Sequence, residues 1–145
     1  MKLPDVNLLV YAADDNSARH EQAREWVDET MSGSETVGFA WAVMVGFVRV
    51  ITNPAIFARP WDATKALDVV DLWLGQPSAT VVHPTARHAA VLRELLAPLG
   101  TAGNLTSDAH LAALAIEHGA TLYSSDNDFS RFSGLRWVDP LHDAS

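Results

Sequence analysis

Acidic residues stand at three points of the chain where an expected strand or loop meets a helix or a turn. Asp5 follows the short apolar segment that opens the chain, Asp108 lies in the first turn of an apolar helix, and Asp126 and Asp128 follow another apolar segment. Carboxylates drawn together repel one another unless a cation joins them, and hard oxygen ligands suit Mg²⁺ or Mn²⁺. A metal held in this way activates a bound water and stabilises charge on a phosphodiester. The pattern therefore favours metal-dependent phosphodiester hydrolysis.

Each of these acidic residues also has an ordinary structural explanation. Asp5 can cap a helix that begins near Asn7, Asp108 gains from the helix dipole, and Asp126 and Asp128 are typical turn residues. Taken singly, these explanations are sufficient. They do not explain why all four residues would gather at one edge of a sheet.

Apolar segments alternate between strand-like and helix-like patterns along the chain. The predicted strands cover residues 1–5, 35–39, 79–83, 120–125 and 135–140, and the predicted helices cover 7–15, 17–32, 40–51, 62–74, 85–99 and 106–119. Ser17, Asp62 and Thr85 are the expected N-caps of three helices. Strands separated by helices predict a parallel sheet with helices on both faces, whose ligands bind beyond the carboxyl ends of the strands.

The composition predicts one domain over residues 1–145 in a cytoplasmic protein. The chain has no cysteine, which excludes disulfides and thiolate metal sites, and its histidines show no spacing typical of zinc ligands. No apolar run is long enough to span a membrane, and no signal peptide is evident. The net charge of −8 argues against a nucleic-acid-binding protein, unless a cation neutralises the clustered carboxylates. An acidic balance also suits a basic partner.

Three segments resemble the PIN-domain ribonucleases and, more closely, the VapC toxins of bacterial toxin–antitoxin pairs. They are PDVNLLVYA (4–12), GNLTSDAHLAALAIEHGATLYSSDNDFSRF (103–132) and GLRWVDP (134–140). The segment TNPAIFARPW (52–61) is similar to one VapC subgroup. The resemblance implies a three-layer α/β/α sandwich with a mostly parallel central sheet.

The same resemblance implies an endoribonuclease in which water, activated by Mg²⁺ or Mn²⁺, cleaves cellular RNA. The implied metal ligands are Asp5, Asp108, Asp126 and Asp128, of which the first three would be catalytic. Asn7 would orient Asp5 by hydrogen bonding, and Ser125 would support Asp126 or the attacking water. Arg49 is a candidate contact to the RNA phosphates.

The implied partners are a cognate VapB-type antitoxin, an RNA substrate (tRNA, rRNA or mRNA) and a second copy of the chain. Apolar surface on the helices predicted at 17–32 and 40–51 is expected to serve a homodimer. The antitoxin of this family tends to place a basic side chain near the carboxylates, which agrees with the acidic balance of this chain.

One position departs from the family pattern. The family usually carries a glutamate in the third helix, three residues before an arginine, and this chain has Gly46 before Arg49. A site with one acid fewer leaves open a catalytically weak or silent PIN-fold binding module. A phosphatase is a third reading, but it needs a second acid where the sequence reads Asp5–Val6–Asn7, and no glycine-rich phosphate loop is present.

Overall fold

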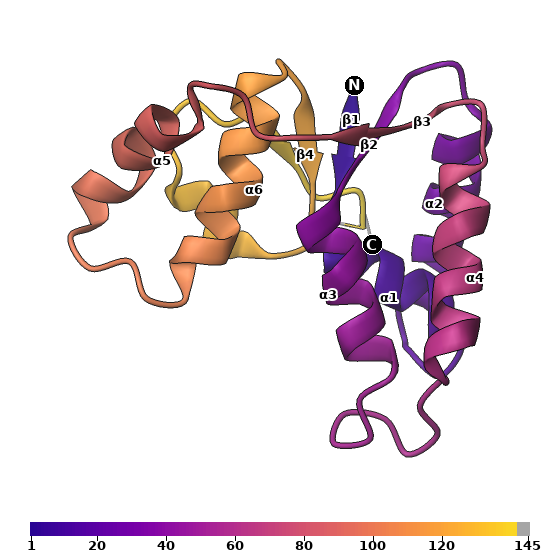
Figure 1. Ribbon diagram of the computed structural model, residues 1–145. Coiled ribbons are helices and arrows are strands. Elements are labelled where there is room, and N and C mark those ends of the chain that lie inside the picture. Colours follow the sequence, from indigo (N-terminus) through magenta and orange to yellow (C-terminus); the bar gives the residue numbers. More distant parts are fainter. Residues whose placement is uncertain (142–145) are drawn as a thin grey trace.

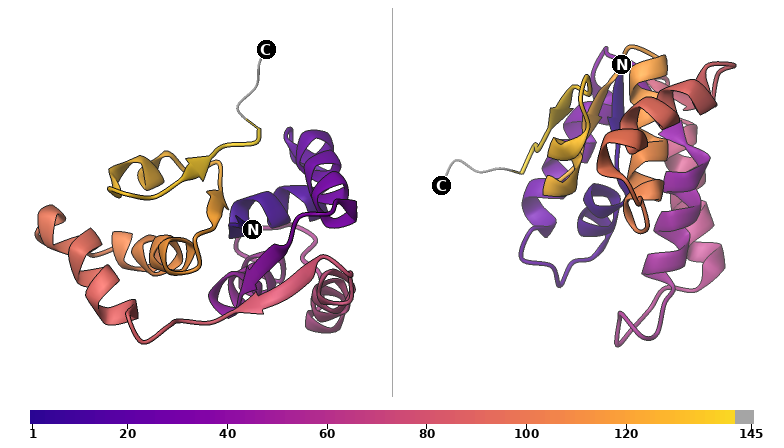
Figure 2. Two further views of the ribbon diagram at one scale, coloured as in Figure 1. Left: turned by 90° about the horizontal axis from the view of Figure 1, so that it is seen from above. Right: turned by 90° about the vertical axis from the view of Figure 1, so that its left-hand side faces the viewer.

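A five-stranded parallel sheet forms the centre of an α/β/α sandwich (Figures 1 and 2). The computed structural model describes residues 1–141, so the last four residues of the predicted domain lie outside the described part. The strands are β1 (Lys2–Pro4), β2 (Val37–Ala40), β3 (Ala79–Val82), β4 (Thr121–Tyr123) and β5 (Trp137–Val138). Each overlaps a predicted strand, and the predicted fold class is confirmed.

All six predicted helices are present. They are α1 (Val6–Ala13), α2 (His20–Ser32), α3 (Trp41–Ile51), α4 (Ala63–Leu74), α5 (His88–Leu96) and α6 (Leu105–Glu117). Two short 3₁₀ helices follow α5 and β4, namely η1 (Ala97–Leu99) and η2 (Asn127–Arg131). Within residues 1–141, no helix combines the length and the apolar character that crossing a bilayer requires.

The expected caps were correct at one helix and wrong at two. The Asp62 carboxylate accepts a hydrogen bond from the Lys65 N–H at 2.8 Å and caps α4 as predicted. Ser17 and Thr85 each lie three residues before the first residue of their helix, and the structure shows no side-chain cap at either helix. The hydroxyl of each accepts instead from the backbone N–H two residues later, which forms a local turn.

The order of the strands places the point where the winding direction reverses between β1 and β4. The sheet order is β3-β2-β1-β4-β5, so the chain runs from β1 to one edge and then returns to the other side of β1. In open α/β sheets, ligands bind at the carboxyl ends of the strands where the direction of winding reverses. Asp5 directly follows β1, and Ser124 directly follows β4.

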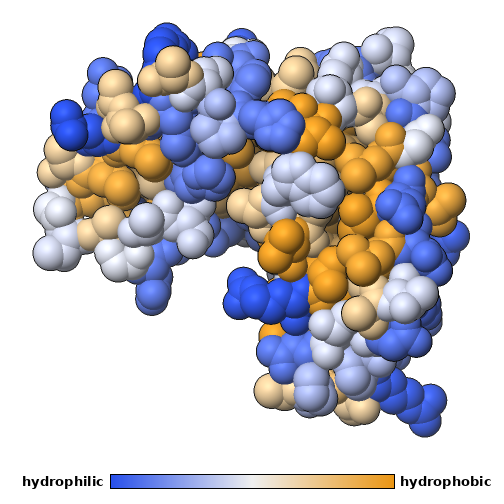
Figure 3. All heavy atoms as spheres, in the orientation of Figure 1, coloured by the Kyte–Doolittle hydropathy of each residue, from blue (hydrophilic) through white to orange (hydrophobic). Residues whose placement is uncertain are grey.

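Buried apolar residues fix α6 against this part of the sheet. Leu3 of β1 pairs in register with Leu122 of β4, and both are fully buried. Leu111 and Leu114 of α6 are also buried, as their spacing predicted. Figure 3 shows the molecule hollowed between the part built on α5 and α6 and the part built on α3 and α4. The first turn of α6, which carries Asp108, borders this hollow (Figures 1 and 3).

Candidate active site

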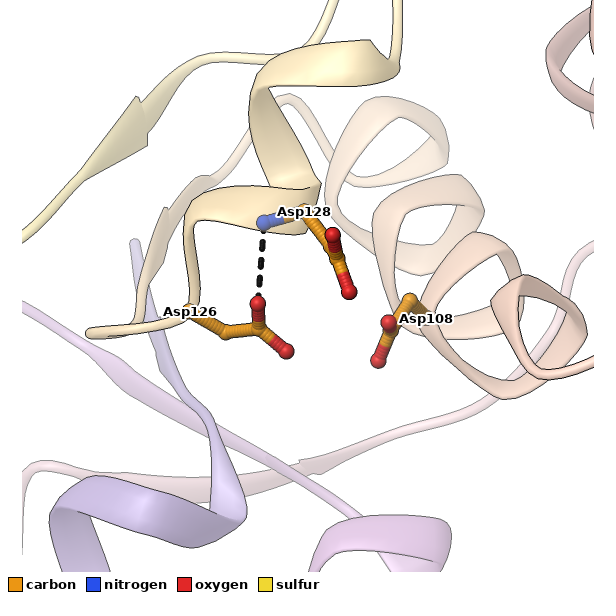
Figure 4. Close-up of side chains that lie close together, drawn as sticks. All are labelled: Asp108, Asp126 and Asp128. Atoms are coloured by element: carbon orange, nitrogen blue, oxygen red, sulfur yellow. Dashed lines mark hydrogen bonds between the residues drawn. The ribbon is translucent and has the colours of Figure 1, made fainter.

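Three carboxylates from two separate segments converge beyond the carboxyl end of β4. One oxygen each from Asp108, Asp126 and Asp128 lie within 4.8 Å of one another. Figure 4 shows the side chain of Asp108 extending from α6 toward those of Asp126 and Asp128. Asp126 is the N-cap of η2, and its carboxylate accepts from the Asp128 N–H at 2.8 Å. Asp126 therefore forms the turn that the sequence suggested and also belongs to the acidic cluster.

Asp5 lies beside this group and is fixed by two hydrogen bonds. One oxygen accepts from the Val6 N–H at 2.7 Å and so caps α1, and the other accepts from the Ser124 hydroxyl at 2.7 Å. Burial raises the pKa of Asp5, and the hydrogen bond from Ser124 opposes that rise. Among residues 1–141, the closest set of acidic oxygens does not include Asp5. The structure thus brings three expected ligands together and sets the fourth at their side.

Ser124 connects the two parts of the site, a role that sequence reasoning missed. Its hydroxyl donates to Asp5 and accepts from the Asp126 N–H at 3.0 Å and from the Asn7 side-chain amide at 3.3 Å. One donated and two accepted bonds use the full capacity of a hydroxyl group. Ser124 is fully buried, so its removal would leave three polar groups without this partner inside the protein.

The expected support of Asp126 by Ser125 was wrong for a geometric reason. Its hydroxyl donates to Asp139 at 3.0 Å and not to Asp126. Side chains alternate between the two faces of an extended segment, and Leu122 and Ser124 both point to the buried side. Counting in steps of two from the buried Leu122 would have selected Ser124.

The hydrogen bonding expected between Asn7 and Asp5 runs through Ser124. The single hydroxyl hydrogen of Ser124 goes to Asp5, so Asn7 has to present its NH₂ group to Ser124. Its other atom, Oδ1, is buried and has no hydrogen-bond partner among the described residues. A buried acceptor without a partner, one hydrogen bond away from the Ser124 that holds Asp5, suits a bound water molecule.

The charges of the cluster act most strongly on Asp108. Burial, followed by the negative charges of Asp126, Asp5 and Asp128, raises the pKa of Asp108 to about 6. A divalent cation would remove this repulsion. The three oxygens within 4.8 Å of one another belong to carboxylates, the hard ligands that Mg²⁺ prefers, so the residues present fit a metal.

Comparisons with known proteins identify the family of this chain. A family model described as PIN domain matches residues 2–135. The chain belongs to the PIN-domain family. This PIN domain is 46% identical over 140 residues to Ribonuclease VapC37 of Mycobacterium tuberculosis, with 97% of each chain covered. It is 38% identical over 143 residues to Ribonuclease VapC33 of the same organism, with 99% of this chain and 100% of the relative covered.

A solved structure supports the same fold. The VapBC2 structure from Rickettsia felis, bound to a DNA fragment from its promoter, matches with a TM-score of 0.69 and 17% identity, covering 94% of this chain and 96% of the other. Together, the relatives and the solved structure confirm the resemblance to VapC proteins that the sequence motifs indicated.

The PIN domain has no room for an acidic side chain at Gly46 as it is now packed. A Cβ atom added at this position would lie 2.9 Å from Cγ2 of Val6, the residue after Asp5. The glycine therefore allows α3 to approach α1 closely, which the sequence pattern did not reveal. Arg49, the expected phosphate contact, lines an apolar groove with Trp41 between α3 and α4. The lining of this groove includes no residue of the acidic cluster.

Proposed function

We propose that this chain is a Mg²⁺- or Mn²⁺-dependent endoribonuclease and the toxin of a VapBC-type pair. The convergence of Asp108, Asp126 and Asp128 carries the proposal, because carboxylates from two segments are held together against their own repulsion. The names of the relatives, which are ribonucleases of the VapC group, support it. We further propose that the whole chain is a single PIN domain and acts in the cytoplasm.

The side chains divide the work in a definite way. Asp108, Asp126 and Asp128 would hold the cation directly, and Asp5 would complete the negative field from the side. A divalent cation at this position supplies Lewis-acid stabilisation of the phosphodiester and a water of lowered pKa. Ser124 keeps Asp5 and the backbone of Asp126 in fixed positions.

The proposal includes three partners. A VapB-type antitoxin is supported by the match to a VapBC complex, and the acidic cluster would accept a basic side chain from it. The substrate would be tRNA, rRNA or mRNA. The third partner is a second copy of the chain.

Asp108→Asn tests the proposal because it separates catalysis from folding. Among the described residues, the Asp108 side chain makes no hydrogen bond, and it is repelled by its neighbours. The variant should therefore keep an unfolding free energy within about 1 kcal/mol of the parent. Total bacterial RNA incubated with Mn²⁺ should show discrete cuts with the parent and none with Asp108→Asn.

Asp68→Asn is the matched control, since Asp68 is exposed on α4 and outside the acidic cluster. It should cut like the parent. Equal cutting by the parent and by Asp108→Asn would contradict the proposed site and indicate a contaminant. Intact RNA with all three proteins, in spite of Mn²⁺ binding, would favour the catalytically silent binding module that Gly46 suggested.

A further inference from the structure

Arg131 is the one positive side chain that an ion pair places at the acidic cluster within residues 1–141. Its Nε atom lies 3.8 Å from Oδ1 of Asp128. The other ion pairs in this part of the chain involve Glu35, Asp28 and Glu117, none of which belongs to the cluster. The carboxylates that would hold a cation therefore have a guanidinium as their neighbour.

The geometry of η2 explains why Arg131 stands over Asp128. η2 is a 3₁₀ helix, in which residues three apart lie on the same side and about 6 Å apart along the axis. The side chain of Asp128 extends toward Asp108 (Figure 4). Arg131 thus follows the acidic cluster on the same side of the helix, one turn further along.

The contact with Asp128 is loose and leaves the guanidinium available. A separation of 3.8 Å is too long for a hydrogen bond, and the side chains of Arg131 and Asp128 are 57% and 48% exposed. Ion pairs with this much exposure contribute little to stability. The N–H donors of the guanidinium fork can therefore take a phosphate, whose oxygens match the fork in geometry and in charge.

Arg131 is not needed to keep Asp128 in position. The Asp128 N–H donates to the Asp126 carboxylate at 2.8 Å, and the ring of Phe129 is buried in the core. These two contacts fix η2 beside the sheet without help from the guanidinium. A purely supporting role therefore explains little about Arg131.

RNA needs positive partners on the protein, and two other arginines of this acidic chain are placed elsewhere. The net charge is −8. Arg49 lines the apolar groove between α3 and α4, and Arg136 donates to the Gly119 carbonyl at 2.6 Å. Arg131 is the cation that adjoins the carboxylates.

We propose that Arg131 is a substrate-binding residue that contacts the RNA phosphate next to the one being cleaved. Once Asp128 shares its charge with a bound cation, it holds Arg131 less strongly, and the guanidinium turns to the RNA at little cost. The contact positions the strand and does not read its sequence, because it is made to a phosphate. This inference rests on the proposed function, since it names a residue that holds the substrate at the same site.

The test compares Arg131→Gln with Arg24→Gln. Arg24 is the matched control, because its Nε atom also lies 3.8 Å from a carboxylate, that of Asp28, in an exposed pair on α2 outside the acidic cluster. Each variant loses one positive charge and one loose ion pair. Urea unfolding should give both variants the stability of the parent.

Binding is measured by the fluorescence anisotropy of a fluorescein-labelled oligouridylate, with Ca²⁺ in place of Mn²⁺. Ca²⁺ also takes carboxylate oxygens but acidifies its bound water less, so the probe should stay intact. Arg131→Gln should weaken binding by about tenfold or more. It should also lower the slope of log affinity against log salt by about 0.7, the value for one phosphate contact on a single strand. Arg24→Gln should change neither quantity.

Calorimetric titration with Mn²⁺ in the absence of RNA separates a phosphate contact from a support of Asp128. A support would weaken Mn²⁺ binding when it is removed. The proposal predicts that Arg131→Gln binds Mn²⁺ as tightly as the parent or up to about fivefold more tightly, because a positive charge beside the carboxylates is gone.

Each contrary outcome has a distinct meaning. Oligouridylate binding by Arg131→Gln at the parent's affinity, or equal weakening in Arg24→Gln, would overturn the inference. Weaker binding of both Mn²⁺ and the oligouridylate by Arg131→Gln would make the residue a support of Asp128 instead. A parent that cuts RNA but does not bind the oligouridylate would overturn this inference alone. A parent that binds it through Arg131 but cuts no RNA would overturn only the nuclease proposal.

Discussion

The contact between Gly46 and Val6 predicts a measurable coupling between two neighbouring helices. A Cβ at position 46 would lie 2.9 Å from Cγ2 of Val6, against about 3.5–4.0 Å for an ordinary carbon contact. Val6 lies in a helix, where a β-branched side chain has essentially one rotamer, so it cannot turn aside. Such overpacking costs about 1–3 kcal/mol, while replacing a helical glycine with alanine gains about 1 kcal/mol.

Gly46→Ala should therefore lower the unfolding free energy by up to about 2 kcal/mol in the parent. In a Val6→Ala background the clash is absent, and the same change should raise the unfolding free energy by about 1 kcal/mol. Urea unfolding of the parent, the two single variants and the double variant measures this coupling. Equal effects of Gly46→Ala in both backgrounds, within about 0.5 kcal/mol, would refute the packing argument.

The same pair decides whether the family's glutamate can be restored. Gly46→Glu alone should not tighten Mn²⁺ binding, because Val6 obstructs the start of the side chain. Combined with Val6→Ala, it should tighten binding by about tenfold or more, since affinity rises with the number of charged ligands. Calorimetric titration distinguishes the two cases. Tightening by Gly46→Glu to the same extent with and without Val6→Ala would show that Val6 is no obstacle.

Two further predictions concern the hydroxyl and the carboxylate at the centre of the site. Ser124→Ala should lower the unfolding free energy by about 1–3 kcal/mol and weaken Mn²⁺ binding, because it leaves buried polar groups unpaired and removes the bond that lowers the pKa of Asp5. Ser125→Ala is its control and should leave Mn²⁺ affinity unchanged; equal losses in both variants would contradict the role of Ser124. The pKa of Asp108 is raised to about 6, so the metal-free folded state keeps a proton that the unfolded chain releases near pH 4. The contribution of Asp108 to the unfolding free energy should therefore fall as the pH rises from about 4 to about 6. The affinity for Mn²⁺ should rise over the same pH range, because the carboxylate loses its proton. Urea unfolding at a series of pH values should show a shallower fall in Asp108→Asn, and an unchanged slope would count against the shifted pKa.

The sequence predicted the sheet and the helices well because apolar periodicity is a local signal. It also predicted that Asp5, Asp108, Asp126 and Asp128 would gather at one edge of the sheet, since the carboxyl ends of parallel strands share that edge; the structure groups the last three and leaves Asp5 beside them. The sequence left a cap role and a site role open for Asp5; the structure shows the cap on one oxygen of the carboxylate, and the other oxygen accepts from Ser124.

What the sequence did not reveal depended on distant partners. The Thr85 hydroxyl was read as a helix cap, but it donates to Glu117, 32 residues away, at 2.6 Å. His88 showed no partner by spacing, yet the packing of α5 on α6 brings it to 2.9 Å from His110. Gly46 signalled a missing acid, but only the position of Val6 explains why a glycine is needed there.

The central claim is that the acidic cluster holds one divalent cation. Anomalous diffraction from crystals grown with Mn²⁺ tests it most directly. We predict a single strong peak between Asp108, Asp126 and Asp128, with carboxylate oxygens about 2.0–2.6 Å from it. Crystals that diffract well but show no peak at this position, or show the peak among other residues, would contradict the account.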